Sequence, residues 1–404
     1  MKFKQTEIGC IPEHWKVLPI RDVTMAVTDY VANGSFASLA ANVSYKNDKD
    51  VAVLIRLVDY NNNFQGNFVY IDDHAYNFLS KSKLYGGEII ISNVGANVGT
   101  VFRCPTLPYK MSLAPNSIMV KFNENNDFYF HWLKSRNGQQ MIKSIVTGSA
   151  QPKFNKTNFR QMLVPVPPIE EQNRIAAILN AIADKINKNR QINDNLLAQA
   201  QTLYKQFFPY SVQDDLPDGW RIGTVGEIIE IHDSKRIPLS SADRAKMEKK
   251  IYPYYGAASL MDFVDNYIFD GKYLLLGEDG TVVDDAGYPI LQYVWGQFWV
   301  NNHAHILTGR LGYDVESLYM LFKQTPVKSI VTGAVQPKIS QANLRSVQVV
   351  IPPEHNLREY NNLVEPLFSL FRANEEDCKT LTALRDTLLP KLMSGEIDVS
   401  SVQL

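Results

Sequence analysis

The stretch Ile145-Val-Thr-Gly-Ser-Ala-Gln-Pro-Lys153 returns as Ile330-Val-Thr-Gly-Ala-Val-Gln-Pro-Lys338, 185 residues further along the chain (330 − 145 = 185). At this offset residues 145–168 and 330–353 are identical at 12 of 24 positions, and both copies end in Pro-Pro. A unit repeated over such a length predicts two equivalent modules, each a folded unit in its own right. Two linked modules suit a target that itself has two parts.

The composition bounds the class of protein. The 404 residues are 45% hydrophobic and 21% charged, which is enough for about two to four packed domains. The net charge is −1, so any binding of nucleic acid has to come from local patches. The three cysteines are far apart and outside any Cys-x-x-Cys pair, which is typical of thiols in a reducing compartment. No signal segment and no long apolar run is seen. We therefore expect a cytoplasmic protein with no membrane partner.

The repeat divides the chain into four parts. Each half opens on a similar motif, Ile11-Pro-Glu-His-Trp15 and Leu216-Pro-Asp-Gly-Trp220, and ends in a long helical pattern. Between these lie short apolar runs bounded by Gly and Asn, which are typical of strands, and one helical stretch in each half. We expect globular domains at residues 1–163 and 213–348 and helical spacers at 164–212 and 349–404. The expected strands are Glu88–Asn93, Ser117–Phe122, Lys272–Leu276 and Ala304–Leu307, and the expected shorter helices cover residues 127–143 and 314–325.

Each Pro-Pro is followed by a heptad pattern, and the two patterns keep the 185-residue offset. Such a pattern predicts a coiled coil, although two amphipathic helices that each pack on their own domain are the alternative. The shared offset favours pairing, and because the first helix has to run from one domain toward the next, we expect an antiparallel pair that acts as a ruler. Asn189 and Asn374 occupy the same seam position and would penalise slipped registers. The predicted seam comprises Ile175, Leu179, Ile182, Ile186, Asn189, Leu196 and Leu203 in the first helix and Leu367, Phe371, Asn374, Leu381 and Leu388 in the second.

Motifs for catalysis are missing from the sequence. No Asn/Asp-Pro-Pro-aromatic motif of an amino-methyltransferase, no phosphate-binding P-loop and no Gly-x-Gly-x-x-Gly fingerprint occurs. The pair His303-x-His305 lacks a third metal ligand nearby in the sequence, and the loop Gly95–Gly99 is more typical of a tight turn after a strand than of a phosphate cradle. We expect no catalytic residue, no metal and no cofactor on this chain.

Binding residues are indicated by the repeated loop. Residues 143–160 contain four cations and no acid, and residues 328–345 contain three cations and no acid. Such loops suit contacts to DNA phosphates, although Asn155 or Asn158, and Ser340, could instead cap a helix. The predicted DNA-contacting residues of the loops are Thr147, Gln151, Lys153, Asn155, Lys156 and Arg160, and Thr332, Gln336, Lys338 and Arg345. Base reading is expected from loops that differ between the modules, with Asn93, Asn97 and Asn116 as candidates in the first module and Tyr254, Tyr255, Ser259, Asn301, Asn302 and His303 in the second.

These motifs together resemble a known family, the specificity (S) subunits of type I restriction–modification systems. The resemblance rests on the paired loops Thr147–Lys153 and Thr332–Lys338 and on VPVPPIEEQNRIAAIL from Val164 to Leu179. It also rests on LLPKLMSGEIDV from Leu388 to Val399 and on the stretch from Tyr254 to Gly280, so it spans essentially the whole chain. The second module departs from the pattern, since Glu354-His-Asn-Leu357 stands where Ile169-Glu-Glu-Gln172 stands in the first.

The resemblance implies a mixed α/β (α+β) fold with a pseudo-two-fold internal repeat, in which two target-recognition domains are separated by two long helices forming an antiparallel coiled coil. It implies that double-stranded DNA is read at an asymmetric split site. The implied partners are two methyltransferase (modification) subunits and, optionally, two restriction–translocase subunits, with S-adenosylmethionine on the modification subunit. Two alternatives remain open at this point, the specificity part of a methyltransferase-only or fused system and a coiled-coil scaffold that binds only protein.

Overall fold

The computed structural model describes residues 2–333 and 335–402, so Ala334 of the second repeated loop lies outside the described residues. Contacts divide the chain into two compact units. Unit 1 comprises Met1–Asn187 and Cys378–Leu404, and unit 2 comprises Lys188–Asp377. Both boundaries cut the long helices, so each unit contains one globular domain and part of each helix. The four-part division of the sequence remains a prediction. Within the described residues, no helix is long and apolar enough to cross a membrane.

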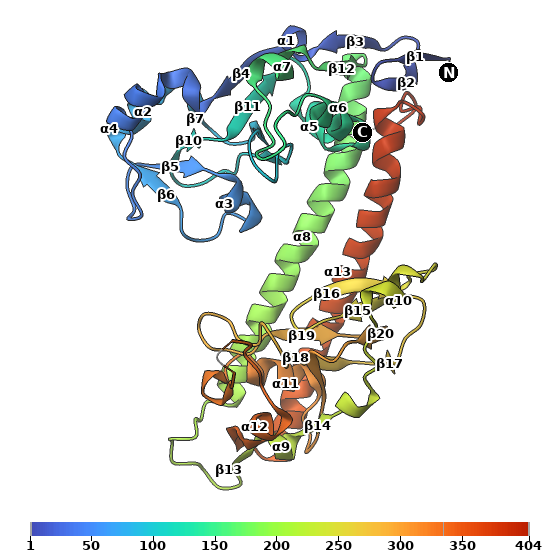
Figure 1. Ribbon diagram of the computed structural model, residues 1–404. Helices are drawn as coiled ribbons and strands as arrows, with labels where there is room; N and C mark the ends of the chain where they lie inside the picture. The colour runs from blue at the N-terminus through green and yellow to red at the C-terminus, as the bar shows by residue number, and fades with distance from the viewer. Residues whose placement is uncertain (1, 334, 403–404) are drawn as a thin grey trace. The chain divides into compact units, whose positions relative to one another are not determined.

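Unit 1 is built around two four-stranded sheets (Figure 1). The strands expected from the sequence are present, and their apolar side chains form the core together with Trp15, Trp132 and the first turns of the long helix that follows. The first sheet has the order β4 (Thr24–Asp29), β11 (Ser117–Phe122), β8 (Ile89–Ser92) and β9 (Val101–Arg103), and the second has the order β6 (Val69–Ile71), β5 (Ala52–Ile55), β10 (Lys110–Leu113) and β7 (Lys83–Leu84). Two short ribbons pair β1 (Phe3–Thr6) with β2 (Gly9–Pro12) and β3 (Lys16–Pro19) with β12 (Leu163–Val166). The helices are α1 (Ile20–Val23), α2 (Phe36–Asn42), α3 (Leu57–Asn61), α4 (Asp73–Phe78), α5 (Asn126–Lys134), α6 (Arg136–Ser144) and α7 (Lys156–Gln161).

Unit 2 repeats the plan of unit 1. Its principal sheet has the same antiparallel arrangement as the first sheet of unit 1. As in unit 1, there is also a second four-stranded sheet. The principal sheet has the order β14 (Ile229–Ile231), β21 (Ala304–Gly309), β18 (Tyr273–Gly277) and β19 (Leu291–Val294), and the second has the order β16 (Leu260–Val264), β15 (Tyr252–Tyr255), β20 (Gln297–Val300) and β17 (Phe269–Asp270). The remaining elements are β13 (Arg221–Thr224) paired with β22 (Gln348–Ile351), and the helices α9 (Val225–Ile228), α10 (Ser241–Ala245), α11 (Val315–Phe322) and α12 (Gln341–Ser346). The repeat that the sequence predicted is therefore a repeat of structure.

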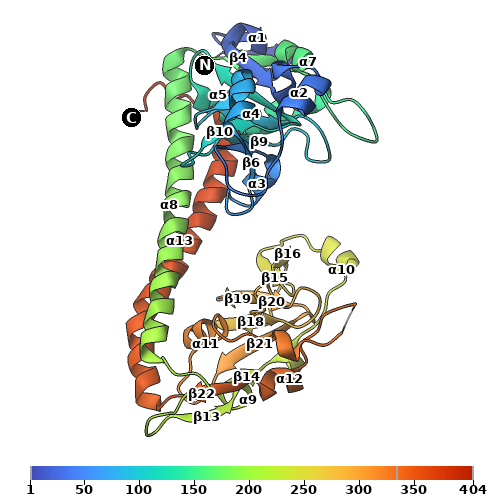
Figure 2. The same cartoon turned by 90° about the vertical axis from the view of Figure 1, so that its left-hand side faces the viewer.

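The two long helices are α8 (Ile169–Phe207) and α13 (Glu354–Met393), which lie side by side in both views (Figures 1 and 2). In unit 1, Ile182 and Ile186 of α8 pack against Cys378 of α13. In unit 2, the hydroxyl of Tyr360 donates to the carbonyl oxygen of Ala200 at 3.2 Å. Because residues late in α8 meet residues early in α13, the pair is antiparallel, as predicted.

The helices also pack on their own globular domains. Both interpretations of the heptads are therefore correct, since the helices pair with each other and also pack on the domains. Ile175 and Leu179 belong to the core of unit 1, and Leu367 packs against the core of unit 2. The seam positions thus serve two interfaces. Each helix end is fixed to a domain by the same apolar burial that stabilises the helix pair.

The two matched asparagines do not contact each other. Asn374 donates from Nδ2 to Oδ1 of Asn193 at 2.9 Å, and Asn189 donates to Oδ2 of Asp377 at 2.8 Å. An antiparallel pair brings Asn374 opposite position 193, whose own repeat partner (193 + 185 = 378) is Cys378. Asn189 therefore lies opposite Cys378 and donates its hydrogen bond to the carboxylate of the neighbouring residue, Asp377. Polar pairs still lie in the seam, but the repeat symmetry is broken there.

One buried histidine makes the stability of unit 1 depend on pH. His131 of α5 is 7% exposed and its Nε2 lies 2.8 Å from Oδ1 of Asn180. Burial lowers the pKa of His131 to about 4, whereas an unfolded histidine has a pKa of about 6.5. Between these two pH values His131 is protonated in the unfolded chain but neutral in the folded chain. The free energy of unfolding of unit 1 therefore falls by about 3 kcal/mol as the pH falls from about 6.5 to about 4. Urea unfolding at several pH values should show this loss in the wild type but not in His131→Gln, and an identical pH dependence of both proteins would contradict it.

Candidate nucleic-acid interface

The repeated sequence of unit 1 forms an exposed hairpin loop. Thr147 and Lys153 exchange two backbone hydrogen bonds of 2.8 Å, which close the loop at its base. Gly148 has a φ of 88°, and a Cβ there would lie 2.8 Å from the carbonyl oxygen of Gln151, so the turn requires glycine. The side chains of Thr147, Gln151 and Lys153 are exposed. The structure thus presents these three predicted residues together on one loop.

Unit 2 builds the same loop with the same contacts. Thr332 and Lys338 exchange hydrogen bonds of 2.9 and 2.7 Å, and a Cβ on Gly333 would lie 2.3 Å from the carbonyl oxygen of Gln336. In each unit the loop is hydrogen-bonded to a residue shortly after a strand of the sheet, β18 in unit 2 and β8 in unit 1. The amide of Gly280 donates to the carbonyl oxygen of Pro337 at 2.9 Å, as the amide of Gly95 donates to that of Pro152 at 2.9 Å in unit 1. Because 280 − 95 is also 185, the anchor belongs to the repeat.

The helix after each loop is capped by the residue that the capping interpretation named. The side chain of Asn155 accepts from the amide of Asn158 at 2.8 Å, and Ser340 accepts from Asn343 at 3.1 Å. Asn155 thus has a structural role that accounts for its presence. Its contact to DNA remains a prediction.

The first residue of each of these helices contacts an aspartate, which is the last residue of β4 in unit 1 and lies two residues after β14 in unit 2. Lys156 forms an ion pair of 2.8 Å with Asp29, and Gln341 donates to Asp233 at 2.6 Å. Arg160 donates to the backbone oxygen of Val27 at 2.8 Å. Lys156 and Arg160 are therefore tied into unit 1 and offer less free charge to a phosphate than Lys153 does.

The two loop lysines differ in their surroundings. Lys338 lies 3.4 Å from a carboxylate oxygen of Glu278 and 3.8 Å from one of Asp279. Asn93 and Val94 occupy the equivalent positions in unit 1 (93 + 185 = 278, 94 + 185 = 279), and no ion pair of Lys153 is found among the described residues. The charge of Lys153 is therefore open to a ligand, whereas that of Lys338 is compensated. The sequence showed both lysines but not this difference.

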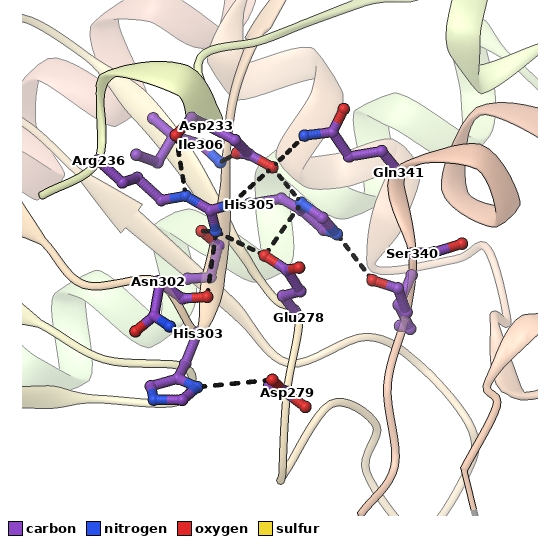
Figure 3. Close-up of polar contacts among 12 residues, drawn as sticks. Asp233, Arg236, Glu278, Asp279, Asn302, His303, His305, Ile306, Ser340 and Gln341 are labelled. Carbon is purple, nitrogen blue, oxygen red and sulfur yellow. Dashed lines mark hydrogen bonds and ion pairs between the residues drawn. The ribbon is translucent and has the colours of Figure 1, made fainter. Parts of the chain in front are cut away.

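Behind the second loop lies a buried charged network (Figure 3). His305 is fully buried, and its two ring nitrogens lie 2.6 Å from Oδ2 of Asp233 and 2.8 Å from the carbonyl oxygen of Ile339. Arg236 donates to Glu278 at 2.5 Å and forms an ion pair of 3.3 Å with Asp233. Burial alone would raise the pKa of Asp233, but the hydrogen bonds and positive charges of its neighbours hold it below its usual value.

The same network contains the one set of side chains in the described residues with metal-ligand geometry. Ligand atoms of Asp233, Glu278 and His305 lie within 4.8 Å of one another. A metal would have to displace Arg236 from both carboxylates, and both ring nitrogens of His305 already face acceptors. His303 does not join them, since it turns to Asp279 at 3.7 Å. The arrangement balances charge within the protein and leaves no open ligand position for a metal.

The other predicted base-reading residues differ in how far their side chains are exposed. Asn97 and Asn302 are exposed. Tyr254 and Asn301 are only 1% and 4% exposed, which corrects the expectation that they face a ligand. The Tyr254 ring packs under Arg244, and the Asn301 side chain bonds within its own turn. Isolated Tyr and Asn residues carry no sequence signal that separates such buried positions from surface ones.

The remaining candidates lie between these extremes. Tyr255 is half-buried against Phe298, and Asn93 donates from its side chain to the carbonyl oxygen of Phe154 at 3.1 Å. Arg345 is half-buried beside Gly226. None of these three is fully available at the surface.

Comparison with known proteins finds the repeat again. The family model described as "Type I restriction modification DNA specificity domain" matches residues 12–198 and a second time residues 217–387. The type I restriction enzyme MjaIX specificity subunit of Methanocaldococcus jannaschii is 22% identical over 439 residues, covering 99% of this chain and 98% of the relative. The MjaVIII specificity subunit of the same organism is 26% identical over 450 residues, covering 99% and 97%.

A solved structure shows the same fold. The crystal structure of the type I restriction–modification S subunit from M. genitalium superposes with a TM-score of 0.58 at 16% identity, covering 95% of this chain and 96% of that one. At this identity the likeness concerns the fold.

Proposed function

The chain belongs to the type I restriction–modification DNA specificity family, and on this premise we propose that its two globular domains each read one half of an asymmetric, split DNA site. The observation that carries the proposal is the duplicated exposed hairpin, held in both units by the same backbone hydrogen bonds. Loops of this kind position a protein on phosphates, while the neighbouring loops that differ between the units are free to read different bases. The exposed candidates for base reading are Asn97 and Asn116 in unit 1 and Ser259 and Asn302 in unit 2.

The partners in this proposal are two methyltransferase subunits and, optionally, two restriction–translocase subunits. An exposed apolar stripe on α13 supports docking of a protein partner. Leu363, Leu370 and Leu384 are 48%, 47% and 44% exposed and are spaced by multiples of seven residues, so they lie along one face of the helix. Exposed leucines in such a row are typical of an interface. Catalysis and S-adenosylmethionine belong to the methyltransferase subunit in this proposal.

The proposal is tested by separating recognition from catalysis. Purified chain with S-adenosylmethionine should not methylate DNA, and methylation should appear when the modification subunit is added. Methylation by the chain alone would show that it is a complete enzyme. Loss of sequence-specific DNA retention even with the partner present would favour a scaffold that binds only protein.

The two loop lysines should contribute unequally to DNA binding. Lys153→Ala removes an uncompensated charge and should weaken binding to all sequences while reducing the slope of log K against log salt by about one. Lys338→Ala also removes the exposed cation beside Glu278 and Asp279, so the negative charge near the DNA increases although Glu278 keeps its ion pair with Arg236. The matched variant Lys338→Ala with Glu278→Gln separates the two effects. Equal slopes for wild type and Lys153→Ala would show that the hairpin does not touch phosphate.

A further inference from the structure

One arginine of unit 1 is held in a fixed orientation by a buried aspartate. Arg56 directly follows β5, and its Nε and Nη2 donate to the two carboxylate oxygens of Asp59 at 3.0 and 2.6 Å. The backbone amide of Arg56 donates to the same carboxylate at 2.9 Å, and Nη2 also donates to the carbonyl oxygen of Asn67 at 3.0 Å. Asp59 is only 5% exposed. A doubled contact to a buried carboxylate restricts the guanidinium to one plane.

The guanidinium of Arg56 has donors left over. It carries five N–H groups, and its contacts to Asp59 and Asn67 use the three on Nε and Nη2. Nη1 makes no hydrogen bond within the part of the chain that the structure describes, and 31% of the side chain is exposed. The two N–H groups of Nη1 are therefore available to a ligand that offers acceptors.

Arg56 lines a cleft that extends to the base of the repeated hairpin. The volume of this cleft is about 410 Å³, within the range of small-ligand sites. Val94 lines it too, and Val94 pairs with Lys153 of the hairpin in an isolated bridge. The exposed residues Tyr45 and Asn116 also line it. The hairpin and the Arg56 cleft therefore share one surface of unit 1.

The charges at the cleft select the kind of ligand. Asp59 compensates the charge of Arg56, and no other residue that lines the cleft, among those described, is charged. A phosphate therefore gains little net attraction here, in contrast to the uncompensated Lys153. A neutral group with neighbouring acceptors and no donor suits the free N–H groups. Of the base edges in the major groove of DNA, guanine presents O6 and N7 as acceptors without a donor, whereas adenine and cytosine present an amino group and thymine a methyl group.

The equivalent position in unit 2 follows from the strand pairing. β5 and β10 are parallel neighbours, and so are β15 and β20. The amide of Ala114, directly after β10, donates to the carbonyl oxygen of Ile55 at 3.2 Å, and the amide of Asn301, directly after β20, donates to that of Tyr255 at 3.0 Å. The residues that follow Ile55 and Tyr255 are therefore equivalent.

Unit 2 has a glycine, Gly256, at the position of Arg56. Gly256 belongs to a tight turn into β16, in which its amide donates to the carbonyl oxygen of Ser259 at 2.9 Å. Met261 covers the position, because its Sδ lies 2.4 Å from where a Cβ on Gly256 would be. Unit 2 thus lacks the donor that unit 1 offers, as two half-sites of different sequence require.

We propose that Arg56 reads a guanine in the half-site of unit 1, with the N–H groups of Nη1 donating to O6 and N7 of the base. Asp59 is the positioning residue that holds the guanidinium in the required plane. This inference rests on the proposed function, since the DNA has to lie against the hairpin that borders the cleft. It adds to that function a named base and the side chain that selects it.

Base analogues test the contact in the unaltered protein. The full chain with its modification subunit is offered duplexes of the site that it methylates. Each guanine of the half read by unit 1 is replaced in turn by 7-deazaguanine, which has a carbon in place of N7. At one guanine the lost acceptor should weaken binding by about tenfold. A half-site without guanine, or binding that no replacement weakens, would overturn the proposal.

A double variant identifies the side chain that makes the contact. Arg56→Gln with Asp59→Asn removes the pair without changing the net charge. It should bind guanine and 7-deazaguanine equally at that position, while the slope of log K against log salt stays at the wild-type value because no phosphate contact is lost. The matched control, Arg21→Gln with Asp22→Asn, removes an exposed ion pair of 3.5 Å and should keep the tenfold difference.

Two results with the double variant would also overturn the role of Arg56. One is an undiminished effect of 7-deazaguanine at every guanine, and the other is a salt slope reduced by about one, which is the sign of a phosphate contact. Specific binding of the unmodified duplex combined with either result leaves the proposed function intact. Absence of specific binding by the wild type would instead contradict the proposed function itself.

Discussion

Arg236→Ala is expected to destabilise unit 2 by about 3–5 kcal/mol, the usual cost of removing one partner from a buried ion pair. The guanidinium is only 14% exposed and contacts both Asp233 and Glu278. Without it, Asp233 keeps His305 and Gln341, and Glu278 keeps the exposed Lys338, but the two carboxylates lose the buried positive charge between them. Urea unfolding of the full chain, with hydrogen exchange to locate the loss in unit 2, measures the effect.

Two comparisons make this result specific. Arg310→Ala removes an exposed pair whose atoms lie 3.8 Å apart and should change stability little. Low millimolar guanidinium should restore part of the stability of Arg236→Ala, because the ion can enter the space that the side chain left. Wild-type stability in Arg236→Ala would show that the buried network does not hold unit 2 together.

Matched insertions of seven residues after Asn187 in α8 and after Asp377 in α13 are expected to change the DNA site while both half-sites stay the same. Each insertion preserves the heptad phase and lengthens its helix by about 10 Å. Since the pairs Ile186 with Cys378 and Asn193 with Asn374 lie on either side of the insertion points, both sets of contacts survive. The non-specific spacer should grow by roughly 3 bp at about 3.4 Å per base pair. In the wild type the half-site centres should lie about one helical turn, roughly 10 bp, apart.

An insertion in α8 alone is the control. It shifts the register of one helix against the other and should abolish activity rather than lengthen the spacer. A folded double-insertion variant that methylates the original spacing would show that the helices do not determine the distance between the half-sites.

Much of the fold could be predicted because the repeat constrains it twice. The heptads keep the offset of the loops, which predicts that the two long helices pair, and the path of the first helix from one domain toward the next predicts that the pair is antiparallel. The contacts of Asn374 could not be predicted, since an antiparallel pair brings it opposite Asn193 rather than its repeat equivalent. Equivalent positions in a symmetric pair need not touch, and a sequence offset identifies only equivalence.

The candidate site was predictable only where the sequence repeats itself, in the two loops. The loop lysines were evident, but the acids that compensate Lys338 lie at positions where unit 1 has Asn93 and Val94, and nothing in the sequence marks those positions as neighbours. The contacts of Arg236 to Asp233 and Glu278 were equally hidden, because Arg236 and Glu278 lie far apart in the sequence. Insertions between the strands change the offset, so only the strand pairing reveals which residues share a place.

The central claim is that two modules read two independent half-sites. Sequencing of methylated bases in a host that carries this chain and its modification subunit tests it most directly, with the wild type compared with a chain whose residues 216–328 come from a relative. We expect two short specific sequences separated by a non-specific spacer, and we expect the exchange to alter one of them while the other stays the same. A single continuous site, or a change in both halves after the exchange, would contradict the claim.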